Sequence, residues 1–446
     1  MTIEAAHRAA IEEEAADLAG LAEGLHRQTG SRDFDRLIAE FDRIPQEARS
    51  ARAAEEALEA GALTLRRRWL DLADAETHKS YRSPSAEQTV KTPTRFFENF
   101  GYERELQPTA LETRCAAFFG SLPKGWRADH ILFSSGQAAM AASLHLAERL
   151  APAATKRPMN VIHAGAYFET SELLSMLAAR FHTMATGHAA LSTPWTGADI
   201  ILIEPIFYEG RFARIPTSEI GRRLDGGGAT ILIFDDTLTG GAVDVEQDLS
   251  ALEDIETRAV IRIASGLKLL QGGLELANVG IVSLYERREN NANAAMRRLR
   301  ALLGLGLRFA DVAGLEAPWF LNRDYTRRYS EAVFAHNQAL ATALTAHSRS
   351  FECVSHPSVD SAAGVAPFCI MRLSSSKLSD YEALSQRIRQ ETERRKIIFD
   401  RGGSFGFRGH RYDVVSPANA PPFLRVAMGR RDGWSLRGVV DLLQEI

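Results

Sequence analysis

The sequence has little cysteine, with only three residues in 446, at Cys115, Cys353 and Cys369. Their wide spacing matches neither a disulfide framework nor a zinc-binding motif. So few thiols are typical of proteins that work in a reducing compartment. The composition therefore predicts a cytoplasmic protein with no disulfide scaffold and no metal site.

Long hydrophobic runs and an excess of basic residues are also absent. No segment approaches the ~20 apolar residues that span a bilayer, and the acidic start MTIEAAHRAAIEEEAADL lacks the apolar core of a secretion signal. The 53 Lys and Arg residues are balanced by 57 Asp and Glu residues, for a net charge of -4. Because nucleic-acid binders carry basic stripes, we expect neither a membrane nor a nucleic-acid polymer as partner.

Internal repeats and low-complexity linkers are missing too, and the chain divides into three zones. Up to about residue 78 the apolar residues follow helical spacing, with breaks at TGSRD and at RIPQE, where Pro45 cannot continue a helix interior. We expect a helical N-terminal region over residues 1–95. It would be either a packing or dimer-forming arm or part of the wall of a substrate pocket.

The next zone, residues 96–325, contains short apolar runs separated by helix-length segments, and the runs are HILFS, NVIHA, DIILIE, ATILIF, AVIRI and NVGIVSL. This alternation predicts βαβ units and a mostly parallel sheet covered on both faces. Residues 326–446 combine helical patterns with the strand-like runs FCIMRL and LRVAM, which predicts a small C-terminal α+β domain. The predicted fold class is α/β, preceded by a helical extension.

Ligands of an open parallel sheet gather at the carboxyl ends of its strands, so the residues after each run matter most. After HILF come Ser135, Gly136 and Gln137, at the start of a predicted helix whose free amides can hold a phosphate. Many such turns carry Ser and Gly without binding anything. After ATILIF comes Asp235, which could equally cap the segment that follows it.

Lys268 stands in SGLKLLQGG, three residues after Ser265 and between two runs predicted to be buried strands. One interpretation is that it opens a surface helix, because lysines are almost never fully buried unless paired. The other is a lysine that forms a Schiff base with pyridoxal phosphate. That cofactor needs an amine for its aldehyde, amides and a hydroxyl for its phosphate, and an acid for its ring nitrogen. Along the chain the strand ends supply the turn amides first, then the acid, and last Ser265 and the amine of Lys268.

These motifs resemble those of the cysteine and methionine metabolism family of fold type I pyridoxal-phosphate enzymes, over roughly residues 95–446. In order, they are a Tyr-x-Arg motif in GYERELQPT, an SSGMAA-like SSGQAAMAA, an Asp-Asn-Thr-like DDT and a Ser-x-Thr-Lys-like SGLK, in which the threonine is lost. The resemblance implies a homodimer or homotetramer, because Tyr102 and Arg104 would reach the phosphate held by a neighbouring subunit. The implied cofactor-binding residues are Ser135, Gly136, Gln137, Ser265, Tyr102, Arg104, Thr237 and Tyr208.

The C-terminal segments GGSFGF and FLRVAMG resemble the family's Ser-Leu-Gly and Arg-Leu-Ser-Val-Gly blocks. By that resemblance Arg425 binds the α-carboxylate of the substrate, with Ser404 beside it. A guanidinium matches a carboxylate with two parallel hydrogen bonds, which a lysine cannot form.

Two motifs depart from the family. Its Tyr-Gly-Gly-Thr, with the tyrosine stacked on the cofactor ring, is replaced by HAGAY, so that either His163 or Tyr167 takes that place. Its Glu-Thr-Pro and Asn-Pro are replaced by EPIFY, where Tyr208 either approaches the cofactor hydroxyl or packs beneath the sheet edge. With Lys268 and Asp235, His163 and Tyr167 complete the predicted catalytic set.

The resemblance implies γ-elimination or γ-replacement on a methionine- or homoserine-derived amino acid, with a β,γ-unsaturated intermediate captured by a nucleophile. S-adenosylmethionine has an excellent γ leaving group, and one member of the broad family joins it to a nicotinamide dinucleotide. No GxGxxG fingerprint follows a strand here, so a dinucleotide would bind without a Rossmann motif. The open alternatives are a C–S lyase or β-eliminase of the same family, a fold type I aminotransferase and a non-catalytic cofactor-binding regulator.

Overall fold

The structure, a computed structural model, describes residues 5–78, 88–91, 97–100, 103–151, 157–224, 230–240, 243–287, 291–347, 350–360, 362, 364–417 and 420–446, with backbone only for those between 76 and 100. Tyr102 lies outside the described residues. Among the described helices, none is long and apolar enough to cross a membrane.

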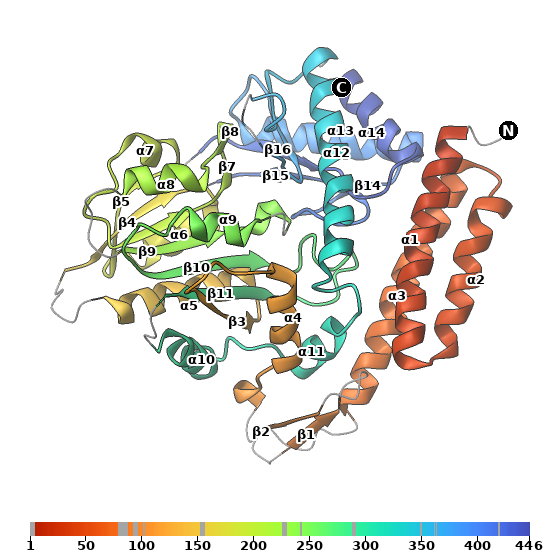
Figure 1. Ribbon diagram of the computed structural model, residues 1–446. Coiled ribbons are helices and arrows are strands. Elements are labelled where there is room, and N and C mark those ends of the chain that lie inside the picture. The colour runs from red at the N-terminus through yellow and green to blue at the C-terminus, as the bar shows by residue number, and fades with distance from the viewer. Residues whose placement is uncertain are drawn as a thin grey trace.

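The N-terminal zone forms three long helices, α1 (Ala5–Thr29), α2 (Arg32–Glu47) and α3 (Ala51–His78). Figure 1 shows them as an upright bundle on one side of the molecule, with α2 outermost. Apolar residues at helical spacing, such as Leu18, Leu25, Leu58 and Leu65, are fully buried in its core. The expected break at Pro45 is wrong in detail, because this proline lies inside α2. It occupies the last turn, where only one helical hydrogen bond is lost and the helix ends two residues later.

The seven-stranded sheet has the order β3-β11-β10-β9-β6-β4-β5. Its strands are β3 (Arg127–Phe133), β4 (Met159–Ala164), β5 (Phe181–Thr186), β6 (Ile200–Ile203), β9 (Thr230–Asp235), β10 (Thr257–Ser265) and β11 (Gly280–Glu286). All described pairings are parallel except those of β11, which runs antiparallel to β10 and to β3. This sheet confirms the predicted fold class.

Helices cover both faces of this sheet, as the continuous apolar runs predicted. Alternate residues of one strand enter different cores, so that Val161 packs on one face and Ile162 on the other. The covering helices are α4 (Thr109–Phe119), α5 (Gly136–Leu150), α6 (Phe168–Met176), α7 (Gly187–Ser192), α8 (Thr217–Arg223), α9 (Val245–Ser250), α10 (Ala292–Leu303) and α11 (Phe309–Leu315). Two short hairpins, β1 (Gln88–Lys91) with β2 (Phe97–Phe100) and β7 (Ile206–Glu209) with β8 (Arg211–Arg214), lie outside the sheet.

The C-terminal part is built on a five-stranded sheet of order β12-β13-β16-β15-β14. Its strands are β12 (Cys353–Ser355), β13 (Cys369–Arg372), β14 (Phe399–Arg401), β15 (His410–Val415) and β16 (Phe423–Ala427), packed with α12 (Arg323–His347), α13 (Leu378–Arg395) and α14 (Trp434–Glu445). The long helix α12 crosses the boundary expected at residue 325. Its first half joins the core of the N-terminal helices through Tyr329 and Val333, and its second half joins the C-terminal core through Leu340 and Leu344.

Candidate functional site

A large cavity opens where the carboxyl ends of β9 and β10 face the five-stranded sheet. Its volume is about 660 Å³, within the usual range for small-molecule sites. It is lined by thirteen residues of the predicted set or their polar neighbours: Ser135, Gly136, Gln137, Tyr167, Glu169, Glu204, Tyr208, Asp235, Thr237, Ser265, Lys268, Ser404 and Arg425. Five of the segments that carry them follow strands of the main sheet, as the strand-end rule predicts, and Ser404 and Arg425 come from the C-terminal part.

The lysine loop, residues 266–279, follows β10 and carries Lys268 at its start, so Lys268 does not open a surface helix. Gln271, fully buried, holds this loop from inside. Its amide nitrogen donates to the carbonyls of Gly266 and Ala277 at 3.0 and 2.6 Å, and its oxygen accepts from the amides of Leu276 and Ala277 at 2.6 and 3.1 Å. Sequence reasoning did not identify Gln271, because a glutamine in a loop carries no motif.

The amine of Lys268 lies in an aromatic and partly charged environment. Its Nζ is 4.6 Å from the ring centre of Phe405 and 5.7 Å from that of Tyr167. Burial lowers the pKa of Lys268 to about 8, with Arg425 contributing in the same direction and Asp235 opposing it. Roughly a tenth of the molecules would therefore carry a neutral amine at pH 7, against well under a thousandth for an ordinary lysine.

Asp235 ends β9 and lines the cavity together with the turn of residues 135–137. Burial, followed by the negative charge of Glu204, raises the pKa of Asp235 to about 6. The amide of Thr237 donates to Asp235 Oδ1 at 3.0 Å. Asp235 is thus a half-buried acid whose side chain is oriented by the turn that follows β9.

The N-terminus of α5 forms the opposite wall. Ser135 caps the helix by accepting a hydrogen bond from the Ala138 amide at 3.0 Å. A Cβ on Gly136 would come within 3.3 Å of the Ser265 Cβ, so a larger residue would require a small shift of the helix end away from β10. The Ser265 amide in turn donates to Thr237 Oγ1 at 3.0 Å. These contacts leave helix-end amides and two hydroxyl groups beside the cavity.

His163 and Tyr167, the two candidates for the ring-stacking position, differ in location. Tyr167 lines the cavity, whereas His163 does not and is buried behind its wall. His163 Nε2 is 2.9 Å from Glu204 Oε1, and the same carboxylate accepts the amides of Ala166 and Tyr167 at 3.2 and 2.9 Å. Glu204, a residue without a predicted role, therefore fixes the loop that presents Tyr167.

The phenol of Tyr167 is also oriented by a carboxylate. It donates to Glu169 Oε2 at 2.6 Å. Burial and this hydrogen bond raise the pKa of Tyr167 well above its usual value, so the phenol stays protonated at physiological pH.

Arg425 enters the cavity from β16 in the five-stranded sheet. Its register neighbours are Asp413 on β15 and Ile370 on β13. Arg425 Nη2 is 3.5 Å from Asp413 Oδ2, a distance that leaves the guanidinium available for another partner. Ser404, at φ +73°, faces the same space, and its buried Oγ has no hydrogen-bond partner within the described part of the chain.

Two further predicted residues take different places. Tyr208 lines the cavity beside Phe423, with ring centres 5.4 Å apart, and burial raises its pKa to about 12. Arg104, in a short 3-10 helix (Glu103–Glu105), is exposed and does not line the cavity of its own chain. No group of three His, Cys, Asp or Glu side chains that could hold a metal occurs among the residues described.

We predict that Glu204→Gln lowers the stability of the protein by about 1–3 kcal/mol, because a buried carboxylate that accepts three hydrogen bonds is replaced by an amide with one acceptor oxygen. Urea denaturation would measure the change. Glu253→Gln, an exposed residue outside the site, should have no such effect. Equal stability of the Glu204 and Glu253 variants would contradict this assignment.

Comparison with known proteins identifies the fold. No protein-family model and no curated protein matches the chain. Among solved structures, it is similar to a methionine γ-lyase, CalE6, from Micromonospora echinospora at 19% identity, covering 78% of this chain and 87% of the other with a TM-score of 0.53. It is also similar to metB from Corynebacterium glutamicum, at 16% identity, 84% and 97% coverage and a TM-score of 0.59. Cystathionine γ-lyase from Lactobacillus plantarum, complexed with L-serine, matches at 14% identity, 77% and 87% coverage and a TM-score of 0.55. The chain therefore shares the fold of these proteins.

Proposed function

We propose that this protein is a pyridoxal-phosphate-dependent enzyme that breaks or replaces a bond at the γ-carbon of an amino acid. The observation that carries the proposal is the position of Lys268, whose partly buried amine shares one cavity with Asp235, the N-terminus of α5 and Arg425. The shared fold with a methionine γ-lyase and a cystathionine γ-lyase supports the same reaction class.

The residues around the cavity fit this cofactor. The amides of Gly136 and Gln137 at the start of α5, with the hydroxyl groups of Ser265 and Thr237, suit a phosphate group. Asp235 suits a protonated ring nitrogen, and the Tyr167 ring, fixed through Glu204, offers a flat surface for stacking. A side chain at position 136 would crowd Ser265, since a Cβ there would lie 3.3 Å from the Ser265 Cβ.

When bound, pyridoxal phosphate would supply an electron sink for negative charge at the α-carbon of the amino acid. Arg425 would bind the substrate carboxylate with two parallel hydrogen bonds. The Lys268 amine would take the α-proton, since burial keeps its pKa low enough for the neutral form to be available. Once that proton has passed on, the same amine would take a proton from Cβ. The electron pair of this C–H bond would form the Cβ–Cγ double bond as the Cγ–leaving-group bond breaks, and the pair of the broken bond would depart with the leaving group.

The charges of the cavity favour a cationic substrate. Four carboxylates line it, from Glu169, Glu204, Asp235 and Asp413, against the cationic groups of Lys268 and Arg425, a formal excess of two negative charges. Once Arg425 binds the substrate carboxylate, Asp413 beside it is left to attract a second positive charge. A sulfonium such as S-adenosylmethionine carries that charge on its γ leaving group, and we propose it as substrate.

A homo-oligomer belongs to the same proposal. The exposed position of Arg104, away from the cavity of its own chain, supports the expectation that it serves the site of a neighbouring subunit. Mixing of two inactive variants, Arg104→Ala and Lys268→Ala, would restore activity if the sites are shared, and would restore none if each subunit is self-sufficient.

The deciding experiment is a visible absorption titration of the purified protein with pyridoxal phosphate, followed by addition of S-adenosylmethionine or methionine. We expect saturable cofactor binding, and release of methylthioadenosine only from the sulfonium, detected by mass spectrometry.

Asp413→Asn should weaken S-adenosylmethionine binding more than methionine binding. A product heavier by a nicotinamide dinucleotide, when that compound is added, would identify the nucleophile. Cleavage of methionine alone would refute the sulfonium proposal, and absence of cofactor binding would refute the whole.

The reaction of Lys268 with pyridoxal phosphate should depend on pH with a midpoint near 8. The neutral amine is the nucleophile, so the rate should rise about tenfold per pH unit below that value and level off above it. Below about pH 6 the protonation of Asp235 should additionally weaken binding, because its negative charge is lost. Borohydride trapping and mass spectrometry of the Lys268 peptide would follow the reaction. A midpoint near 10.5, the ordinary lysine value, would contradict the buried environment.

A further inference from the structure

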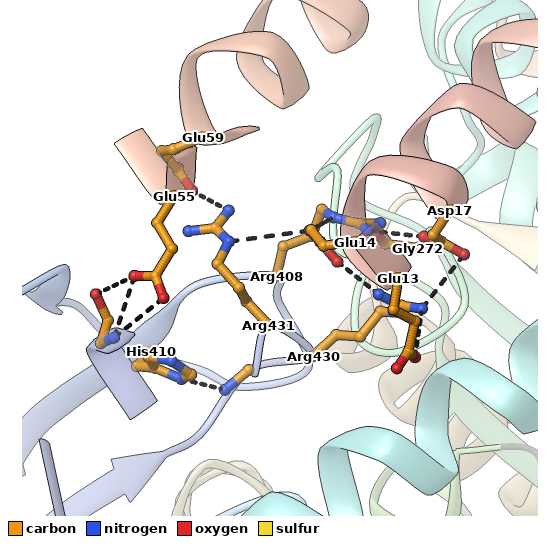
Figure 2. Close-up of polar contacts among 12 residues, drawn as sticks. Glu13, Glu14, Asp17, Glu55, Glu59, Gly272, Arg408, His410, Arg430 and Arg431 are labelled. Carbon is orange, nitrogen blue, oxygen red and sulfur yellow. Dashed lines mark hydrogen bonds and ion pairs between the residues drawn. The ribbon is translucent and has the colours of Figure 1, made fainter. Parts of the chain in front are cut away.

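A cluster of buried charges joins the N-terminal helices to the C-terminal part of the chain (Figure 2). Arg408, Arg430 and Arg431 reach from C-terminal loops toward α1 and α3. Glu14 lies at the centre, 2.8 Å from Arg408 and 2.5 Å from Arg430, with its side chain only 1% exposed. These three cations hold the pKa of Glu14 at about 2 in spite of its burial. None of residues 5–75 lines the cavity, so this cluster is separate from the candidate site.

Arg408 differs from the other two arginines in what it contacts. Its Nε donates to Glu14 at 2.8 Å and its Nη2 to Asp17 at 2.7 Å, both on α1. Its Nη1 donates to the carbonyl of Gly272 at 3.0 Å, in the lysine loop four residues after Lys268. The side chains of Arg430 and Arg431 bind only carboxylates of α1 and α3 among their described hydrogen-bond partners, and their backbone amides donate to the carbonyls of Phe407 and Arg408 at 3.2 and 3.1 Å.

The segment that carries Arg408 also touches Lys268 directly. Phe405, three residues earlier, places its ring 4.6 Å from Lys268 Nζ. Gly406 lies so near the lysine loop that a Cβ there would come within 2.7 Å of the Leu269 amide. Ser404 lines the cavity. Residues 404–408 and the lysine loop are therefore packed against each other beside the reactive amine.

Apolar packing links the same loop to the N-terminal bundle. Leu269, Leu274 and Leu276 belong to the core that the three N-terminal helices build around residues such as Leu18 and Leu25. Arg66 of α3 adds two hydrogen bonds to the carbonyl of Glu275 at 3.1 and 2.9 Å. The loop is thus anchored to the helices on the side facing away from the cavity.

We infer that Arg408 is a positioning residue through which helix α1 holds the lysine loop and the Ser404–Phe405 segment in place around Lys268. This inference rests on the proposed function only in taking Lys268 as the reactive lysine. A guanidinium can bind two carboxylates and a carbonyl at once because its donors form a rigid fork, whereas an ammonium is a compact point charge. The charge alone would keep α1 attached, but the fork is needed to fix Gly272 as well.

The test measures the reactivity of Lys268 in the full-length, cofactor-free protein. Competitive acylation across the pH range, read by mass spectrometry of the Lys268 peptide, reports the pKa of this one amine. We would compare Arg408→Lys, Asp17→Ala and, as matched control, Glu59→Ala. Asp17 pairs with Arg408 at 2.7 Å and, more loosely, with Arg430 at 3.7 Å, and Glu59 pairs with Arg431 at 2.5 Å. The side chain of Arg431 has no described hydrogen bond to the lysine loop. Alanine is the best helix former, so neither helix should be disrupted.

In the wild-type protein we expect a midpoint near 8. Arg408→Lys should raise the midpoint by about one pH unit and Asp17→Ala should raise it in the same direction, because a loosened loop exposes the amine to water. Turnover should fall about tenfold in Arg408→Lys with little change in KM, as expected for a misplaced catalytic group. Glu59→Ala should lower the melting temperature while leaving the Lys268 midpoint unchanged.

An unchanged midpoint in Arg408→Lys and Asp17→Ala, with only a lower melting temperature, would overturn the inference, as would an equal shift in Glu59→Ala. If Arg408→Lys fails to fold, Asp17→Ala decides. It removes one of the two carboxylates that orient the guanidinium of Arg408, while the remaining ion pair with Glu14 should let the chain fold. Failure of the wild-type protein to bind pyridoxal phosphate would refute the proposed function alone, because the acylation measurement needs no cofactor.

Discussion

Replacing Lys268 with alanine should abolish the covalent attachment of pyridoxal phosphate and reduce turnover by about 10³-fold or more. The variant removes both the amine that attaches the cofactor and the base that takes the α-proton, and a general base alone contributes about 10²–10⁴. The readouts are the visible absorbance of the protein after dialysis and the exchange of the substrate α-proton in D₂O, followed by NMR.

Lys377→Ala is the matched control, because that lysine is exposed at the start of α13. It should retain both the absorbance and the exchange. If Lys268→Ala retained them too, Lys268 would be a structural residue and another amine would have to be sought. Circular dichroism would show that the variant is folded.

Replacing Arg425 with alanine should raise KM for the amino acid by about 10²-fold or more, because two charge-assisted hydrogen bonds are lost and each contributes about 1.5–3 kcal/mol. Cofactor binding should persist, since Arg425 belongs to the five-stranded sheet, whereas the residues proposed to hold the cofactor follow strands of the main sheet. Arg425→Lys should recover only part of the loss, because a lysine cannot form both bonds in parallel. Steady-state kinetics with a saturating concentration of cofactor would measure these effects.

The Arg425 variant carries a second expected result. The positive charge of Arg425 helps to lower the pKa of Lys268, so its removal should raise that pKa and move the rise of activity to higher pH. A pH profile that does not move, together with an unchanged KM, would show that Arg425 faces Asp413 only and takes no part in substrate binding.

Six strands of the main sheet followed directly from the sequence, because a strand buried on both faces reads as a continuous apolar run. The seventh, β5, was missed. Its sequence FHTMAT alternates between buried and exposed residues, since it lies at the sheet edge and pairs only with β4. The predicted helix break at Pro45 was misplaced, because a helix can tolerate a proline in its last turn. The local sequence pattern does not show that α2 continues to Glu47.

The candidate site was predictable where it depends on strand ends. Ser135, Asp235 and Lys268 each follow an apolar run, and parallel strands of one sheet must bring their carboxyl ends to the same edge. The sequence could not predict which of His163 and Tyr167 lines the cavity, because this depends on the direction in which a short loop turns. Glu204 decides this, by accepting the amides of Ala166 and Tyr167.

By itself, then, the sequence determined the α/β fold, six strands of the main sheet and the polar residues at strand ends that meet at the cavity, since these depend on the periodicity of burial along short segments. Only the tertiary structure decided what holds Lys268 in place. Gln271 acts inside the loop, and Arg408 bridges the loop to Glu14, which is 394 positions away in the chain. Such pairings leave no local pattern, because they arise from the packing of segments that are distant in sequence.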